Sequence, residues 1–109
     1  IGEDGVPAPL LKDYLPSDVE GFFDEVLRYV KLLYSKAELV HADLSEYNIM
    51  VWGGKPVFID IGQAVLLSHP MADFFLRRDI GNILRFFAKL GLSVPSLEEV
   101  LAWIKRDPP

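Results

Sequence analysis

The stretch from residue 39 to residue 65, LVHADLSEYNIMVWGGKPVFIDIGQAV, constrains the fold more than any other part of the chain. Two apolar runs in it, Ile49–Trp52 and residues 56–61, are rich in the β-branched and aromatic side chains that favour strands. The dipeptide Gly53-Gly54 separates the runs and favours a tight reversal. A polar loop, residues 41–48, comes directly before the first run. The stretch therefore predicts an antiparallel hairpin with the polar loop at one end.

Folding this hairpin brings three oxygen-bearing side chains, Asp43, Asn48 and Asp60, towards the same end of it. Two carboxylates and an amide suit a hydrated Mg²⁺ that is held together with substrate phosphates. Asp43, on a loop, can accept a hydroxyl proton or orient a nucleophile. Asn48 adds a neutral oxygen, and Asp60 can bridge metal and phosphate oxygens. An ordinary polar turn would also contain such residues, but their order, spacing and flanking strands favour a metal and acid–base site.

The composition excludes several classes of protein. The chain has 109 residues, half of them apolar and a quarter charged, which predicts a single globular core. It has no cysteine, which excludes a disulfide framework or a thiolate zinc site and fits a reducing cytosol. No apolar run approaches the ~18 residues of a membrane span, and no signal peptide is visible. The net charge of −5 argues against autonomous nucleic-acid binding. From the missing cysteines, membrane span and signal peptide, we expect a cytoplasmic protein without membrane contact.

A long amphipathic helix is predicted before the hairpin, from residue 17 to about residue 36. Residues 17–20, SDVE, have the pattern of a capping box. Helical spacing leaves Asp24, Arg28 and Lys31 on the outward face. The inward face carries Val19, Phe22, Phe23, Val26, Val30, Leu33 and Ala37.

Two more helices are predicted after the hairpin. The first runs from about residue 71 to residue 90, with a possible interruption near Arg77-Arg78, and it contains Asp79 within its apolar stripe. The second begins at another capping-box pattern, SLEE at residues 96–99, and ends near Lys105 with Val100, Leu101 and Ile104 inward. The apolar stripe of the first consists of Ala72, Leu76, Ile80, Ile83, Phe86, Phe87 and Leu90.

A carboxylate in an apolar stripe is costly unless it is hydrogen-bonded, so Asp79 needs a dedicated partner. We predict that Asp79 accepts hydrogen bonds from the backbone of the polar loop or from His41, and so holds Asp43 in place from beneath. The alternative is an ion pair on the helix surface with Arg78 or a contact with Asn82. His41 itself is predicted to pack under the loop as a structural residue rather than to act as a base.

The order of the site residues is that of protein kinases. The pattern H-x-D-x-x-x-x-N, followed by D-x-G after an apolar strand, supplies a catalytic Asp, an Asn five residues on and a second metal-binding Asp. More specifically, LVHADLSEYNIM followed by VFIDIGQAV resembles the RIO family of atypical serine protein kinases, nearest to its first subtype. The resemblance continues through HPMADFFLRRDIGNILRFFAKLG and covers essentially the whole chain.

This resemblance implies roles for individual residues. Asp43 would be the catalytic aspartate, and Asn48 and Asp60 the metal ligands. Because RIO proteins are also ATPases in which the second aspartate can be phosphorylated, that modification would fall on Asp60. The family implies ATP and Mg²⁺ as cofactors, with Mn²⁺ as an alternative metal, serine kinase activity and a role in maturation of the small ribosomal subunit. The pre-ribosomal small subunit would then be a partner.

The resemblance also implies the fold, an α+β, mostly helical, protein-kinase-like C-terminal lobe with one small antiparallel hairpin that carries the site. Residues 1–16 would be the hinge end and connector, and residues 17–109 the lobe. Ile1, Met50 and Ile59 would contact ATP. The glycine loop, strand lysine and helix glutamate of kinases would precede Ile1 in an N-terminal lobe. We therefore expect this piece alone to bind ATP poorly and to be inactive.

Two features depart from ordinary protein kinases. The lysine that usually follows the catalytic Asp by two residues is replaced by Ser45. Only six residues separate Gly62 from His69, no Ala-Pro-Glu ending follows, and the chain has no threonine, so there is no room for a phosphorylatable activation loop. An ATPase or an autophosphorylating switch therefore fits these residues better than a broad protein kinase.

Two alternatives remain open from the residues. Small-molecule phosphotransferases of the aminoglycoside and choline kinase type carry the same H-x-D-x-x-x-x-N and I-D patterns, although residues 45–47 (SEY) and Gln63 favour RIO. Such enzymes also need extra helices for the acceptor. The other alternative is a non-catalytic pseudokinase scaffold, against which the intact Asp43, Asn48 and Asp60 argue.

Overall fold

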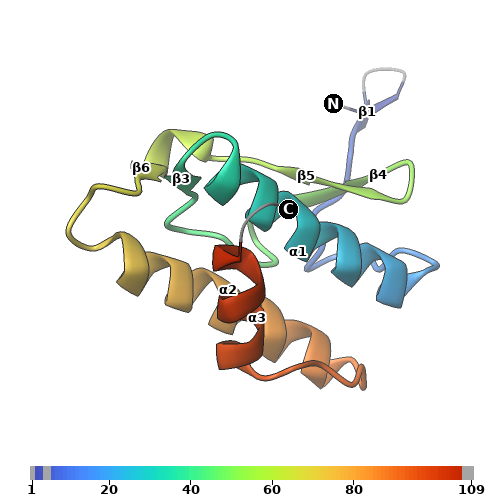
Figure 1. Ribbon diagram of the computed structural model, residues 1–109. Helices are drawn as coiled ribbons and strands as arrows, with labels where there is room; N and C mark the ends of the chain where they lie inside the picture. The colour runs from blue at the N-terminus through green and yellow to red at the C-terminus, as the bar shows by residue number, and fades with distance from the viewer. Residues whose placement is uncertain (1, 4–5, 107–109) are drawn as a thin grey trace.

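The computed structural model describes residues 2–3 and 6–106 and contains three helices and three short antiparallel strand pairs (Figure 1). This agrees with the predicted α+β, mostly helical class. In chain order the elements are β1 (Gly2–Glu3), β2 (Val6–Pro7), α1 (Val19–Ser35), β3 (Leu39–Val40), β4 (Ile49–Trp52), β5 (Lys55–Phe58), the 3₁₀ turn η1 (Ile61–Gln63), β6 (Val65–Leu66), α2 (Ala72–Lys89) and α3 (Leu97–Lys105). Among the described residues, no helix is both long and apolar enough to cross a membrane.

The predicted hairpin is present as β4 and β5, paired from Ile49 opposite Phe58 to Trp52 opposite Lys55. Its turn residues, Gly53 and Gly54, have φ values of 61° and 77°. Two successive residues in the left-handed region match the twist of the flanking strands, and glycine adopts this region without strain.

The second strand is shorter than predicted, because β5 ends at Phe58 and not at residue 61. Asp60, two residues later, adopts a left-handed conformation with φ 58° and precedes the 3₁₀ turn η1. A left-handed residue cannot continue an extended strand, so the chain turns away from β4 at this point.

Residues 9–12, within the segment predicted as hinge end and connector, run along the other side of β4. The amide of Val51 donates to the carbonyl of Pro9 (2.8 Å), and the amide of Leu11 donates to the carbonyl of Ile49 (2.7 Å). A further unpredicted pairing joins β3 to β6, which places the segment before α2 beside the start of the polar loop. The outer edge of β4 is therefore bonded to residues 9–11, and β3 and β6 form a separate strand pair.

Helix α1 begins at Val19 with Asp18 as its N-cap, whose carboxylate accepts a hydrogen bond from the amide of Gly21 (3.0 Å). The capping box predicted at residues 17–20 is therefore wrong by one residue. Asp and Ser are nearly equal as N-caps, and sequence alone does not separate two neighbouring candidates. The predicted inward residues Phe22, Phe23 and Val26 are buried, whereas Ala37 is exposed beyond the helix end.

Lys31 was predicted to point outward, and this is wrong, because it is 4% exposed. Its ammonium group donates to the main-chain carbonyls of Trp103 and Arg106 at the end of α3, and it lies 4.6 Å from the centre of the Trp103 ring. The last carbonyls of a helix have no intrahelical donor and carry a partial negative charge, so a cation is favourable there. Lys31 thus joins α1 to the C-terminal end of α3.

Helix α2 is continuous from Ala72 to Lys89, so the predicted interruption near Arg77-Arg78 is wrong. Arginine is a good helix former, and the pair contains no proline or cap residue to break the helix. Within the predicted apolar stripe Leu76, Ile80 and Ile83 are buried, but Leu90 is exposed at the helix end. Phe87 packs against Phe22 and Phe23 of α1, with ring centres 6.5 and 5.0 Å apart.

Helix α3 begins with the predicted capping box, in which the Ser96 hydroxyl accepts from the Glu99 amide and the Glu99 carboxylate accepts from the Ser96 amide. Its inward residues Val100, Leu101 and Ile104 are buried as predicted. The helix packs on both α1 and α2 and closes the core on the side away from the hairpin (Figure 1).

Candidate active site

The three candidate site residues meet at the base of the hairpin. Asp43 is exposed on the polar loop between β3 and β4, Asn48 is the last residue before β4, and Asp60 is exposed two residues after β5. The Asn48 amide nitrogen Nδ2 donates to the Asp43 carbonyl (2.5 Å) and lies 3.4 Å from its Oδ2. The main chain of Asn48 accepts from the amide of Ile59 (2.9 Å), the neighbour of Asp60. The structure therefore places Asn48 in contact with Asp43 and places Asp60 at the same end of the hairpin, next to Ile59.

Asn48 is oriented so that its oxygen stays available. The residue is only 8% exposed, and its Nδ2 is engaged by Asp43. In the described part of the chain no hydrogen bond reaches Oδ1. Every fully buried side-chain oxygen there has a hydrogen-bond partner, so Oδ1 is not fully buried and keeps access to solvent. This free amide oxygen, near the Asp43 carboxylate and at the hairpin end that carries Asp60, fits a hard cation.

The donor set is too small to hold a metal by protein alone. Within residues 2–3 and 6–106, no group of three or more His, Cys, Asp or Glu side chains is placed to hold a metal ion. Mg²⁺ commonly keeps several waters and binds one or two carboxylates together with substrate phosphates. The residues present therefore fit a hydrated Mg²⁺ shared with a phosphate ligand better than a structural metal.

Asp79 lies directly beneath the polar loop and is 1% exposed. Its Oδ2 accepts from the amide of Ala42 (2.8 Å) and its Oδ1 from the amide of Leu44 (3.0 Å). The predicted hydrogen bonds from the loop backbone are therefore present, and the alternative of a surface ion pair is wrong. Burial raises the pKa of Asp79, against the two amide bonds and the nearby Arg78, which lower it.

His41 is buried under the same loop, with 2% of its surface exposed. Its Nε2 lies 2.7 Å from the carbonyl of Ile59, and its Nδ1 lies 3.2 Å from the amide of Asp43. A carbonyl only accepts and an amide N–H only donates, so these partners make Nε2 the donor and Nδ1 the acceptor. Both ring nitrogens are occupied by the backbone, which agrees with the predicted structural placement of His41.

Two further residues, predicted only as surface partners of Asp79, hold the loop. Arg78 donates to the carbonyl of Ala42 (2.5 Å), and Asn82 donates to the carbonyl of Leu44 (3.2 Å). Asn82 had a positional signal, because residues three apart on a helix lie on the same face, whereas Arg78, directly before Asp79, had none. Nothing in the sequence indicates that their partners are backbone carbonyls.

All six main-chain polar groups of residues 42–44 are therefore bonded to side chains. Asp79 accepts hydrogen bonds from the amides of residues 42 and 44, and His41 accepts one from the amide of residue 43. The carbonyls of residues 42, 43 and 44 accept from Arg78, Asn48 and Asn82, respectively. The loop needs this support, because Ala42 has a φ of 76°, a conformation that costs a residue with a side chain about 1 kcal/mol or more. The conformation of the backbone on both sides of Asp43 is thus set by its surroundings.

The structure describes two of the three residues predicted to contact a nucleotide. Met50 lies opposite Val57 in the hairpin, on the face away from the buried Ile49 and Val51, and is half-buried. Ile59 is half-buried beside His41. Ile1 lies outside the described residues, so its predicted role has no structural counterpart.

A hairpin that carries a Mg²⁺-type donor set, and a preceding loop fixed by a buried aspartate from a long helix, define a protein-kinase-like C-terminal lobe. The family profile of the RIO domain matches residues 1–100. The Rio1 kinase of Methanocaldococcus jannaschii is 48% identical over 89 residues, which cover 82% of this chain and 31% of that protein. The human serine/threonine-protein kinase RIO1 is 39% identical over 106 residues, covering 95% of this chain and 19% of that protein. The chain belongs to the RIO family.

The first subtype is consistent with these relatives, although the mouse kinase RIO3 is also 43% identical over 95 residues. A solved structure supports the fold. The Rio2 kinase of Chaetomium thermophilum, in an ADP/Mg²⁺-phosphoaspartate complex, has a TM-score of 0.69 and 23% identity, covering 87% of this chain and 33% of that one. The chain thus spans about a third or less of these proteins.

Proposed function

We propose that this chain carries the acid–base and metal-binding half of a phosphoryl-transfer site in a RIO-type serine/threonine kinase or ATPase that uses ATP and Mg²⁺. The observation that carries the proposal is the contact of Asn48 with Asp43 on a loop whose backbone is fixed by side chains, at the hairpin end that also carries Asp60. Family membership supports the kinase class.

Asp43 is the residue placed to act on the nucleophile. Its carboxylate is exposed, while its own amide and carbonyl are held by His41 and Asn48. It accepts a proton from a hydroxyl or orients a water, an effect of roughly 10²–10⁴ in rate. Fixing the backbone reduces the loss of orientation when substrate binds.

Asn48 and Asp60 are the proposed metal ligands. Asn48 offers Oδ1 because its Nδ2 is engaged, and Asp60 offers an exposed carboxylate. When bound there, Mg²⁺ would neutralise charge on the phosphate oxygens of the nucleotide. The neutral amide keeps the site from gathering a third negative charge.

Asp60 is also the proposed site of a phospho-aspartate, by analogy with the phosphoaspartate in the Rio2 complex. One carboxylate oxygen would attack the γ-phosphorus of ATP, and the bond from that phosphorus to the β–γ bridging oxygen would break, releasing ADP. Attack of water on the acyl phosphate would then return the carboxylate and inorganic phosphate. This cycle makes the protein an ATPase without a peptide substrate.

The remaining roles rest on the family alone. They are contacts of Met50 and Ile59 with the nucleotide, an N-terminal lobe that completes the ATP site, a cytoplasmic location and a partner in the pre-ribosomal small subunit. The charge of −5 accords with a protein that reaches a ribosomal particle through specific contacts rather than through a basic surface.

The test is Mg²⁺-dependent nucleotide binding and ATP turnover by the whole protein, with single substitutions in the site. Asp43→Asn should keep nucleotide binding and lose turnover, Asn48→Ala should raise the Mg²⁺ concentration needed for half-maximal rate, and Asp60→Ala should lose both binding and turnover. Asp13→Asn, an exposed carboxylate outside the site, is the control and should change neither. Wild-type binding without turnover would instead assign a pseudokinase.

A further inference from the structure

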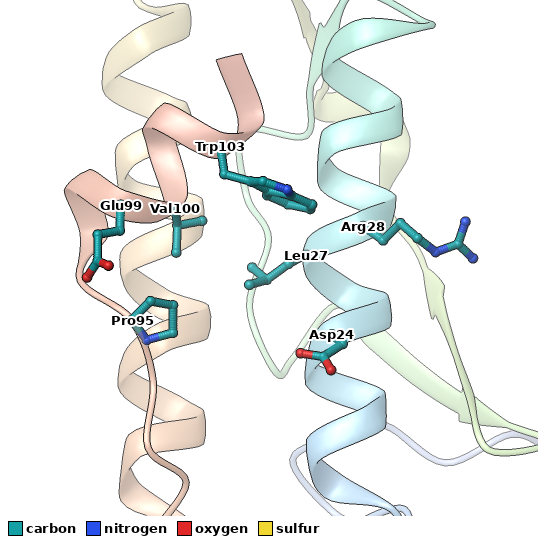
Figure 2. A pocket seen from close by; sticks show the side chains of 7 residues that line it. All are labelled: Asp24, Leu27, Arg28, Pro95, Glu99, Val100 and Trp103. Carbon is teal, nitrogen blue, oxygen red and sulfur yellow. The ribbon is translucent and has the colours of Figure 1, made fainter. Parts of the chain in front are cut away.

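A groove of about 430 Å³ lies between α1 and α3, separate from every residue of the candidate active site (Figure 2). Leu27 and Val100 form its apolar floor, Trp103 and Pro95 its sides, and Asp24 and Glu99 lie at its rim. Figure 2 shows the ring of Trp103 and the side chain of Leu27 directed towards one another across the gap between the helices. Its apolar lining and size are typical of a binding pocket.

The walls of this groove are formed without a ligand. Leu27 and Val100 belong to the hydrophobic core, so their positions are set by packing. The indole of Trp103 has the buried ammonium group of Lys31 4.6 Å from its ring centre, and that ammonium is bonded to the Trp103 carbonyl. A preformed apolar surface loses little conformational freedom on binding, which favours affinity.

The rim of the groove is negatively charged. Within residues 6–106 neither Asp24 nor Glu99 has an ion-pair partner, and Glu99 uses Oε1 for the Ser96 amide, which leaves Oε2. Arg28, the cationic residue of the lining, is neutralised by Glu25 through contacts of 3.2 and 2.9 Å, and in Figure 2 its guanidinium points away from the groove. An occupant therefore meets two uncompensated carboxylates beside an apolar floor.

We propose that the groove docks a short segment of a partner protein in which apolar side chains lie between lysine or arginine residues. The apolar side chains would enter between Leu27 and Trp103, and the cations would lie near Asp24 and Glu99. A second copy of this chain is a poorer occupant, because each copy has a net charge of −5 and the same acidic rim.

The test uses the full chain and a synthetic hexapeptide with two leucines between a lysine and an arginine. Trp52 and Trp103 are the two tryptophans of the chain, so in a Trp52→Phe background the emission reports the groove alone. The peptide should shift the Trp103 emission to shorter wavelength. Peptides with glutamates in place of the cations, or serines in place of the leucines, should bind at least tenfold more weakly.

The matched variant is Asp24→Asn with Glu99→Gln, which removes both charges and keeps an acceptor for the Ser96 cap. It should weaken peptide binding at least fivefold and abolish its dependence on salt concentration. Asp24→Asn alone provides the same test with the cap intact, and Asp13→Asn is the control. Unchanged affinity in these variants, or equal binding of the glutamate peptide, would overturn the proposal. So would a doubling of mass in sedimentation that Asp24→Asn abolishes, because the groove would then bind a second copy.

Discussion

The side-chain amide of Asn82 donates to the carbonyl of Leu44 (3.2 Å), while Asp79, one helical turn earlier, accepts from the amide of the same residue (3.0 Å). One helix thus holds both main-chain groups of Leu44, the residue that directly follows Asp43. The polar loop is therefore positioned by hydrogen bonds to side chains of α2 and not by pairing with a neighbouring strand.

Replacing Asn82 should affect turnover more than folding. Asn82→Ala removes one half-buried hydrogen bond, so the free energy of unfolding should fall by about 1 kcal/mol. In the whole protein we expect kcat to fall by roughly tenfold with little change in KM, because the loop is loosened beside Asp43. Steady-state kinetics and denaturant unfolding measure the two effects. Arg85→Ala removes only the exposed neighbour that bonds Asn82, and a loss of kcat as large there would contradict the assignment.

The pH dependence of stability should carry a signature of Asp79. Because burial raises its pKa in the folded state, protonation of Asp79 favours folding. This contribution is complete below the ordinary value of 3.8 and is lost as the pH rises through the raised pKa. The free energy of unfolding of the wild type, minus that of Asp79→Asn, should therefore decrease with rising pH over this window. Urea unfolding at a series of pH values measures it, and a difference that grows with pH would show that the two amide bonds outweigh burial.

Lys31 should be important for stability through its hydrogen bonds to main-chain carbonyls. Lys31→Met keeps much of the volume but leaves the carbonyls of Trp103 and Arg106 without their donor, so the free energy of unfolding should fall by about 1–3 kcal/mol. Unfolding monitored by tryptophan emission would measure this. Lys36→Met, an exposed lysine that follows the same helix, is the control and should change stability by less than about 0.5 kcal/mol.

Two glycines should respond to alanine in opposite ways. Gly54 has a φ of 77° in the hairpin turn, so Gly54→Ala should lower the free energy of unfolding by about 1 kcal/mol. Gly81 lies inside α2, and an added Cβ meets no atom within 4 Å, so Gly81→Ala should raise it by up to about 1 kcal/mol. Thermal melting of the two variants measures both signs. Destabilisation by Gly81→Ala would mean that the helix needs the small residue for packing.

The sequence predicted well where the signal is local. The hairpin, its glycine turn and the second capping box depend on residues within a few positions of each other, and all three are present. The site residues are predicted from their order and spacing, which carry the chemistry of phosphoryl transfer. Asp79 was found because a carboxylate in an apolar stripe requires a partner.

The errors and omissions concern partners that lie far away in the sequence or belong to the backbone. Lys31 bonds carbonyls 72 and 75 residues later, and a wheel of α1 alone places it outside. Arg78 and Asn82 also bond carbonyls, which have no side-chain identity and leave no pattern in a single sequence. The β3–β6 pairing was missed for another reason, because strands of two residues are too short to show a period.

In the described chain no backbone-to-backbone hydrogen bond reaches residues 42–44, whose polar groups are held by side chains alone. The position of Asp43 therefore depends on the lengths of those side chains. Lengthening one of them by a single carbon, as in Asp79→Glu or Asn82→Gln, adds about 1.5 Å without changing any charge. Such shifts are large for a reacting group, so the loop would tolerate even chemically conservative exchanges on α2 poorly.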